Sequence, residues 1–350
     1  MVIRHFSLAV PGSLDTPTGG YAYDRRVTKE LRVQGWRVDI CDLGDGFPRP
    51  DAQQLARAQT MLSALPVDAP VVVDGLAFGV MDDCAAVLSR THRLVALVHH
   101  PLALETGVSA DDAVSLRHSE RIALSFTRHV IVTSPQTAQI LATDYGVARE
   151  KIAVAVPGTD AMRFSPGSDD GFCRLLSVGS VVPRKGYDVL IAALAPLRDL
   201  PWRLTIVGDN TRALATTAAV RDAVAAAGLN DRIQLTGAIS DSALADAYLK
   251  ADVFVTASHF EGYGMAATTA IACGLPIVAT AGGALSQTLG GTGLLVPPND
   301  ISALRDALRR MITDPDLREN QCQASRMAAA KLPNWGDTAA RFAAAIESVT

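Results

Sequence analysis

The stretch SHFEGYGMAATTAIACGLP, residues 258–276, decides how the rest of the chain is interpreted. It follows the apolar segment VFVT at residues 253–256, which has the composition of a buried strand. Gly262 and Gly264 allow the backbone to turn tightly into a helix, and Gly274 can end that helix. The first amides of a helix have no intrahelical partner and carry the positive end of its dipole. We therefore expect an anion such as a diphosphate to bind at this turn.

The same stretch resembles the donor-site signature of the family 4 retaining glycosyltransferases, also described as glycosyl transferases group 1. In that signature a Glu-Gly-Phe/Tyr-Gly loop runs into a helix that carries a second Glu eight positions after the first. Glu261 matches the first Glu, which the resemblance implies would hydrogen-bond the donor sugar. Thr269 stands where the second Glu would bind the ribose, and it can keep one hydrogen bond without offering a carboxylate charge.

The resemblance covers nearly the whole chain and implies the GT-B fold, an α/β architecture of two Rossmann-like doubly wound domains that face each other across a cleft. Short apolar runs that alternate with helical patterns, and a length of 350 residues, also indicate two domains with parallel sheets. We expect an N-terminal acceptor domain at residues 1–165 and a nucleotide-sugar donor domain at residues 166–333. The helix at residues 334–350 is expected to pack back on the first domain.

The composition narrows the classes of function. Hydrophobic residues make up 49% of the chain, charged residues 19%, and the formal net charge is −4. Because nucleic acids require a basic face, we expect no nucleic-acid partner. The five cysteines are scattered without a Cys-x-x-Cys pair, which predicts no metal site and a reduced, cytoplasmic protein. The start of the chain lacks the pattern of a signal peptide, and no apolar run is long enough to be a transmembrane segment.

Two features of the first domain are candidates for the donor site. Gly19 and Gly20 precede a helix predicted at residues 21–34, and the resemblance implies that such a glycine pair faces the donor phosphates; the alternative is a flexible loop. His99 and His100 end an apolar strand, and the resemblance implies that a histidine at this place contacts the donor sugar. We favour His100 for this role, and the alternative is a structural pair.

The first predicted helix is rich in cations, among them Arg25 and Lys29. Some members of the family use such a helix to bind anionic membranes. Asp24 and Glu30 interrupt the basic run and no aromatic stripe accompanies it, so we expect a solvated face and no peripheral membrane contact.

In the second domain, Arg184 and Lys185 follow a strand and a glycine, at the mouth of the next helix. Cations there would complement a diphosphate that lies on the helix after Glu261. The resemblance implies that the nucleobase meets the backbone at Gly237, Ala238 and Ile239. The residues expected around the donor diphosphate are Arg184, Lys185, Gly19, Gly20, Gly262, Tyr263, Gly264 and Met265.

The resemblance implies a retaining, metal-independent transfer by front-face attack, from a UDP-sugar or, less favoured, a GDP-sugar. The nucleotide diphosphate sugar is then a co-substrate, and no cofactor is expected. The catalytic candidates are Glu261, His99 and His100. The acceptor is an unidentified hydroxyl of a small molecule, a glycan or a lipid-linked sugar.

One alternative is a catalytically degenerate GT-B protein that binds a nucleotide or partner without transfer, which the loss of the Glu at Thr269 would fit. Another is a GT-B enzyme that does not transfer sugar to an acceptor, such as a nucleotide-sugar epimerase.

Overall fold

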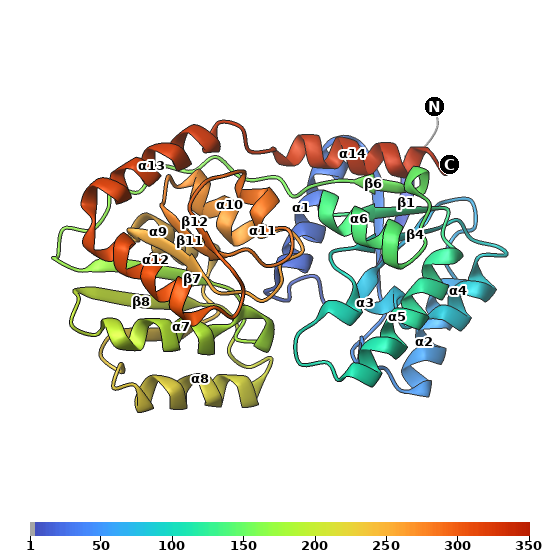
Figure 1. Cartoon of the computed structure of the whole chain (residues 1–350). Coiled ribbons are helices and arrows are strands. Elements are labelled where there is room, and N and C mark those ends of the chain that lie inside the picture. The colour runs from blue at the N-terminus through green and yellow to red at the C-terminus, as the bar shows by residue number, and fades with distance from the viewer. Residues whose placement is uncertain (1–3) are drawn as a thin grey trace. The chain divides into compact units, whose positions relative to one another are not determined.

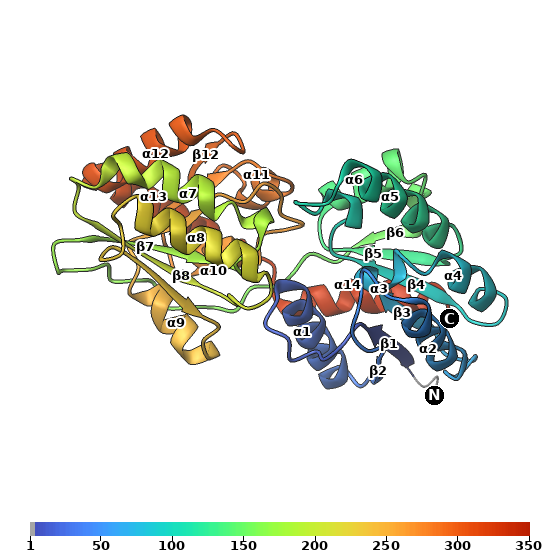
Figure 2. The same cartoon turned by 90° about the horizontal axis from the view of Figure 1, so that it is seen from below.

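The computed structural model describes residues 4–350, so that Met1–Ile3, at the start considered above, lie outside the described residues (Figure 1). The chain divides into two compact units. Unit 1 ends at Gly158 and takes up Pro333–Thr350, and unit 2 is Thr159–Leu332. Each unit is built on a six-stranded sheet with helices packed on both faces (Figure 2). The expected α/β architecture of two Rossmann-like doubly wound units is therefore confirmed.

The sheet of unit 1 has the strand order β2-β1-β3-β4-β5-β6, and neighbouring strands are parallel. Its strands are β1 (His5–Val10), β2 (Arg37–Asp42), β3 (Val71–Asp74), β4 (Leu94–Val98), β5 (His129–Val132) and β6 (Ile152–Val154). The central strands β3 and β4 are buried throughout and consist mainly of Val and Leu, as expected for strands that are covered on both faces. The direction of strand order changes between β1 and β3, where ligands of such sheets commonly bind.

The helices of unit 1 are α1 (Gly19–Val33), α2 (Ala52–Ser63), α3 (Gly75–Phe78), α4 (Asp82–Leu88), α5 (Ala110–Ser125), α6 (Pro135–Asp144) and α14 (Trp335–Glu347), with short 3-10 turns η1 (Leu102–Leu104) and η2 (Arg149–Lys151). The expectation that Gly19 and Gly20 lie in a loop is wrong, because they form the first turn of α1. The helix starts early because the side chain of Thr18 accepts a hydrogen bond from the amide of Tyr21.

Unit 2 repeats the plan with the strand order β12-β11-β10-β7-β8-β9, all parallel. Its strands are β7 (Cys173–Val178), β8 (Trp202–Val207), β9 (Ile233–Gly237), β10 (Val253–Thr256), β11 (Ile277–Thr280) and β12 (Leu294–Val296). Its helices are α7 (Tyr187–Leu194), α8 (Leu214–Ala226), α9 (Asp241–Leu249), α10 (Met265–Ala272), α11 (Leu285–Leu289), α12 (Ile301–Thr313) and α13 (Pro315–Ala329), with 3-10 turns η3 (Pro183–Lys185) and η4 (Ala195–Leu197). The strand order changes direction between β7 and β10.

The chain passes from unit 1 to unit 2 after Gly158, seven residues before the boundary expected at residue 165. Ser165 explains the difference, because its hydroxyl donates to the carbonyls of Leu249 and Ala251 and its amide donates to the carbonyl of Cys273. These bonds tie the segment that ends at the expected boundary to unit 2.

The terminal helix α14 belongs to unit 1 and lies against α1 (Figure 1). The hydroxyl of Thr338 donates to the carbonyl of Val156 over 2.8 Å, and the ring of Phe342 lies 5.8 Å from that of Phe6. The preceding helix α13 begins at Pro315, because Asp314 caps it and Pro315 occupies its first turn.

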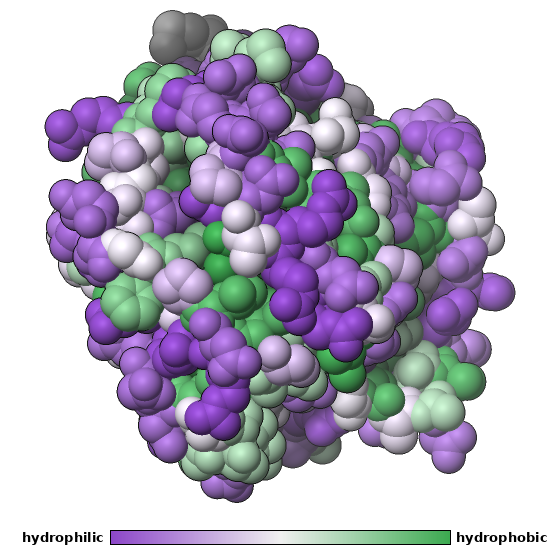
Figure 3. All heavy atoms as spheres, turned by 60° about the vertical axis from the view of Figure 1, so that its left-hand side comes forward, coloured by the Kyte–Doolittle hydropathy of each residue, from purple (hydrophilic) through white to green (hydrophobic). Residues whose placement is uncertain are grey.

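Among residues 4–350, no helix combines the length and the apolar composition needed to cross a bilayer. Hydrophilic side chains cover much of the face drawn in Figure 3, with hydrophobic side chains between them.

Candidate functional site

The candidate site of unit 2 is formed by the segments that follow β7 and β10, the neighbouring strands at which the strand order changes direction. The segment after β7 leads into η3 and supplies Arg184 and Lys185, and the segment after β10 supplies Glu261. The amide of His259 donates to the carbonyl of Arg184 over 2.8 Å, which ties the two segments together. The fold therefore unites residues that lie 76 positions apart in the sequence.

Glu261 is the centre of this site and is buried, with 9% of its surface exposed. Its Oε1 accepts hydrogen bonds from Lys185 Nζ over 2.6 Å and from Ser258 Oγ over 2.7 Å. Its Oε2 lies 3.4 Å from Arg184 Nη1, and the same nitrogen donates to the carbonyl of Phe260 over 2.7 Å. Burial alone would raise the pKa of Glu261, but the charges of Lys185 and Arg184 outweigh burial and lower the pKa to about 2. Glu261 is thus an ionised carboxylate at neutral pH.

The helix that starts beside Glu261 has an open N-terminus. Gly264 precedes α10 with φ +102°, a backbone conformation that favours glycine, and a Cβ atom added there would lie 2.6 Å from the side chain of Leu285. The first turn closes through the amides of Ala267 and Thr268, which donate to the carbonyl of Gly264. Because no side chain caps this end, the amides at the start of α10 can receive an anion.

Thr269 lies on α10 one turn after Met265 and is half-buried. Its hydroxyl donates to the carbonyl of Met265 over 3.0 Å, within its own helix. The hydroxyl proton that we expected Thr269 to offer a ribose is therefore used by the backbone. The ribose contact stays a prediction.

The expected nucleobase segment lies at the end of β9, two strands from β7 in the sheet. Gly237 has φ +75°, and its carbonyl accepts a hydrogen bond from the amide of Gly208 over 3.1 Å. The structure brings Gly237, Ala238 and Ile239 to the same sheet edge as Glu261, because both segments follow the carboxyl ends of parallel strands. Their contact with a base stays a prediction.

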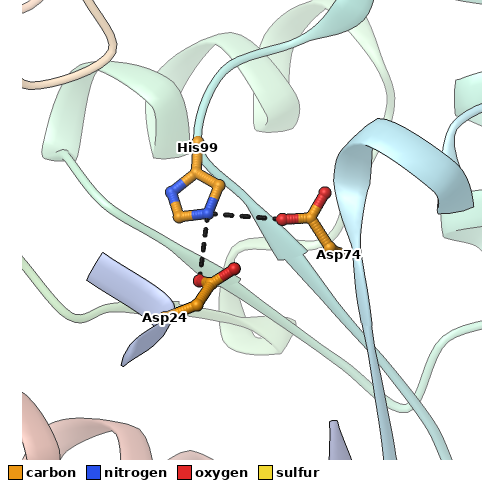
Figure 4. Close-up of side chains that lie close together, drawn as sticks. All are labelled: Asp24, Asp74 and His99. Carbon is orange, nitrogen blue, oxygen red and sulfur yellow. Dashed lines mark ion pairs between the residues drawn. The ribbon is translucent and has the colours of Figure 1, made fainter. Parts of the chain in front are cut away.

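A second cluster lies in unit 1, at the corresponding edge of its sheet (Figure 4). Asp24 projects from α1, Asp74 ends β3, and His99 follows β4. His99 Nε2 lies 3.2 Å from Asp24 Oδ1 and 3.5 Å from Asp74 Oδ2. The Asp24 side chain is fully buried, that of Asp74 is 6% exposed and that of His99 is 20% exposed. Local sequence did not reveal this convergence, because Asp24 stands out there only as an interruption of a basic run.

The charges in this cluster depend on one another. Burial raises the pKa of Asp24 to about 6, although the nearby His99 opposes the shift. Burial by itself lowers the pKa of His99, but the charges of Asp24 and Asp74 outweigh burial and raise the pKa to about 10. The ligand atoms of Asp24, Asp74 and His99 all lie within 4.8 Å of one another, which is close enough to hold a cation. No other group of three Asp, Glu, His or Cys side chains within residues 4–350 has this spacing.

The other candidates of unit 1 have different surroundings. His100 Nε2 lies 3.2 Å from Glu105 Oε2, so His100 faces a carboxylate of its own. Gly20 lies against the ring of His99, and a Cβ atom added at residue 20 would be 3.3 Å from its Cδ2 atom. On the basic face of α1, Arg25 donates to the carbonyl of Thr16 over 3.3 Å, so this cation holds the loop before the helix.

Comparisons with known proteins agree with the fold described above. Residues 158–327 match the model of the family described as "Glycosyl transferases group 1". The MMP alpha-(1->4)-mannosyltransferase of Mycolicibacterium hassiacum is 29% identical over 319 residues, which cover 86% of this chain and 76% of that protein. The D-inositol 3-phosphate glycosyltransferase of Pseudarthrobacter chlorophenolicus is 32% identical over 255 residues, 68% of this chain and 60% of that protein. The mannosylfructose-phosphate synthase of Agrobacterium fabrum is 30% identical over 240 residues, 63% of this chain and 53% of that protein. The chain thus spans between about half and three quarters of the length of these relatives.

Solved structures resemble the chain over nearly its whole length. Sucrose-phosphate synthase from Thermosynechococcus elongatus has a TM-score of 0.83 at 23% identity, covering 99% of this chain and 98% of that chain. HepE of Anabaena in complex with UDP and glucose has a TM-score of 0.75 at 16% identity, covering 99% of this chain and all of that chain. These likenesses support the fold. The chain is thus similar to the glycosyl transferases group 1 over residues 158–327, and it shares the GT-B fold of these solved structures.

Proposed function

We propose that the protein is a retaining glycosyltransferase that moves a sugar from a nucleotide diphosphate sugar to a hydroxyl acceptor without a metal ion. UDP-sugars are the favoured donors and GDP-sugars the next to test. The observation that carries the proposal is the ionised carboxylate of Glu261, held by Lys185 and Arg184 beside the uncapped start of α10. Cations and open amides suit a diphosphate, while a fixed carboxylate suits the hydroxyls of a sugar.

In this proposal, the diphosphate lies on the first amides of α10 and against Lys185 and Arg184. These groups stabilise the negative charge that develops on the phosphate oxygen as its bond to the anomeric carbon breaks. The bond between the acceptor oxygen and the anomeric carbon forms on the same face, and the acceptor proton passes to the departing phosphate oxygen. The leaving diphosphate therefore acts as the base for its own displacement.

Glu261 orients the donor sugar and does not attack it. Retaining glycosidases place a nucleophilic carboxylate about 5 Å from a carboxylic acid. Here both oxygens of Glu261 are already engaged, one by Lys185 and Ser258 and the other by Arg184. A carboxylate held in this way is a poor nucleophile and a good acceptor of hydrogen bonds from sugar hydroxyls.

The acceptor class is proposed from the relatives. Two of them are named for reactions with D-inositol 3-phosphate and for the synthesis of mannosylfructose-phosphate. Small polyols and sugars that carry a phosphate are therefore the first acceptors to test, ahead of glycans and lipid-linked sugars.

The test incubates the purified protein with UDP- and GDP-sugars, with and without phosphorylated polyols. Released nucleoside diphosphate is measured together with mass spectrometry of the products, and NMR gives the anomeric configuration. The proposal expects one donor to be consumed and an acceptor to gain a sugar with the configuration retained. An inverted product would contradict the retaining mechanism, an isomerised free nucleotide sugar would favour an epimerase, and binding without turnover of any donor would favour a degenerate protein.

A further inference from the structure

The cluster in unit 1 places one ring nitrogen against two carboxylates. Figure 4 shows His99 Nε2 between the side chains of Asp24 and Asp74, at 3.2 Å and 3.5 Å. A neutral ring with its lone pair on Nε2 would direct that lone pair at two negatively charged oxygens inside the protein. Such an arrangement is unfavourable, so Nε2 either carries a proton or faces a metal cation. With a proton on Nε2, two ionised carboxylates beside the ring favour the imidazolium over the neutral ring that keeps its lone pair on Nδ1.

The burial of the three groups favours the proton. A metal ion held by proteins generally has four or more ligands, and here the side chains supply three. Both oxygens of Asp24 and Nε2 of His99 are buried, with almost no exposed surface for a ligating water, and their 3.2 Å contact is an ion pair without hydrogen-bond geometry among the described residues. Asp74 Oδ1 already accepts from the amide of Leu76 over 2.7 Å, which fixes the carboxylate with Oδ2 toward the ring. A proton satisfies the cluster without further ligands.

The ring of His99 is also fixed on its other sides. The backbone carbonyl of His99 accepts a hydrogen bond from Thr133 Oγ1 over 3.1 Å, and the ring of Tyr23 packs edge-on against the imidazole at 5.4 Å. Nδ1 points away from both carboxylates in Figure 4, and a fifth of the His99 side chain is exposed. The nitrogen that is left for a substrate is therefore Nδ1, in a single orientation.

We infer that Asp24 and Asp74 are positioning residues that hold His99 as an imidazolium, so that Nδ1–H is a permanent donor to an accepting oxygen of the sugar or phosphate of the substrate. The inference rests on the proposed function and adds a restriction to it. An imidazolium has no lone pair on either nitrogen, so His99 cannot take a proton from the acceptor. The base in the reaction must be another group.

The other charges around the ring do not alter the balance. Arg25, next to Asp24 on α1, favours the ionised form of that carboxylate. His100, the next residue along the chain, is paired with Glu105. With both carboxylates ionised, the cluster carries one net negative charge when His99 is protonated and two when it is neutral. Asp24 on α1 and Asp74 at the end of β3 therefore both oppose the deprotonation of His99.

The test uses 15N-labelled histidine and NMR between pH 6 and 10, with His99→Gln to identify the His99 signal. The wild-type ring is expected to remain doubly protonated at pH 8. Asp74→Asn keeps the acceptor that caps α3 and removes one charge, so the proton affinity of His99 is expected to fall at least tenfold. Asp83→Asn, which removes an exposed carboxylate of α4, is the matched control and should leave the His99 titration unchanged. A His99 ring that is neutral at pH 8 in the wild type, or that titrates identically in Asp74→Asn, would overturn the inference.

Two further readouts separate positioning from general structural support. Donor turnover by the wild type should be constant from pH 7 to 9, whereas Asp74→Asn should lose activity as the pH rises through its new His99 pKa. An equal loss at every pH would overturn the inference. Elemental analysis should find no stoichiometric metal, and a metal lost in Asp74→Asn would identify a cation site instead. The NMR titration needs no substrate, so an inactive protein with a protonated His99 would refute the proposed function while leaving the protonation established.

Discussion

Replacing Lys185 by Met gives the sharpest test of the diphosphate site, because it removes the charge and keeps the aliphatic stem. Lys185 Nζ lies 2.6 Å from Glu261 Oε1, and 15% of the Lys185 side chain is exposed. The ammonium has three donors, so it can hold Glu261 and a phosphate oxygen together. The substitution should therefore weaken diphosphate binding and also loosen Glu261.

The expected magnitudes follow from these contacts. A hydrogen bond to a charged group contributes about 1.5 to 3 kcal/mol, so the affinity for UDP should fall about 10- to 150-fold. Removing one partner of a buried ion pair costs about 3 to 5 kcal/mol of stability. Arg184 and Ser258 still contact Glu261, so a loss of stability at the lower end of this range, about 3 kcal/mol, is expected for unit 2.

The assay is isothermal titration calorimetry of the wild type and Lys185→Met with UDP and with uridine, combined with thermal unfolding. Binding of UDP should weaken while binding of uridine changes little. Lys250→Met, at an exposed position after α9, is the matched control and should affect neither ligand. Equal losses for UDP and uridine, or an unchanged affinity for UDP, would refute the assignment of Lys185 to the diphosphate.

Three further predictions concern carboxylates and the replaced motif position. Because the pKa of Glu261 is lowered from 4.5 to about 2, its contribution of about 3 kcal/mol to the free energy of unfolding is present above pH 4.5 and is lost as the pH falls toward 2. Glu261→Gln should remove this pH dependence from the acid-unfolding curve. An unchanged curve would contradict the ion pair. Burial raises the pKa of Glu120 from 4.5 to about 8, so its stabilising effect is present below pH 4.5 and lost as the pH rises to 8. Glu120→Gln, which can still accept from the amide of Leu102, should flatten the fall in Tm between pH 5 and 8, and a persisting fall would locate its source elsewhere. Thr269→Glu should tighten UDP binding about tenfold, because it adds a charged acceptor for the ribose hydroxyls. Weaker or unchanged binding in calorimetry would mean that the ribose is held elsewhere.

Local patterns in the sequence predicted the parts of the site that depend on neighbouring residues. The turn at Gly262 and Gly264 and the helix after it follow from backbone preferences within one short stretch, so they could be predicted. Ser258, which donates to Glu261, was not singled out, although its position three residues before Glu261 in a turn was a usable signal. The start of α1 was misplaced because Thr18 caps the helix despite the two glycines that follow.

Contacts between distant segments could not be predicted from local patterns. Asp24, Asp74 and His99 meet because β3 and β4 are neighbours in the sheet and α1 brings Asp24 to the same edge. Asp74 ends an apolar strand that resembles several others, and nothing in its local sequence distinguishes it. Their meeting depends on the order of the strands, which becomes visible only in the folded chain.

A crystal structure of the protein with UDP would test the central claim most directly. The account predicts that the diphosphate lies on the first amides of α10, with a phosphate oxygen within hydrogen-bonding distance of Lys185 Nζ and of Arg184. A diphosphate bound elsewhere, or no bound nucleotide at saturating concentration, would contradict it.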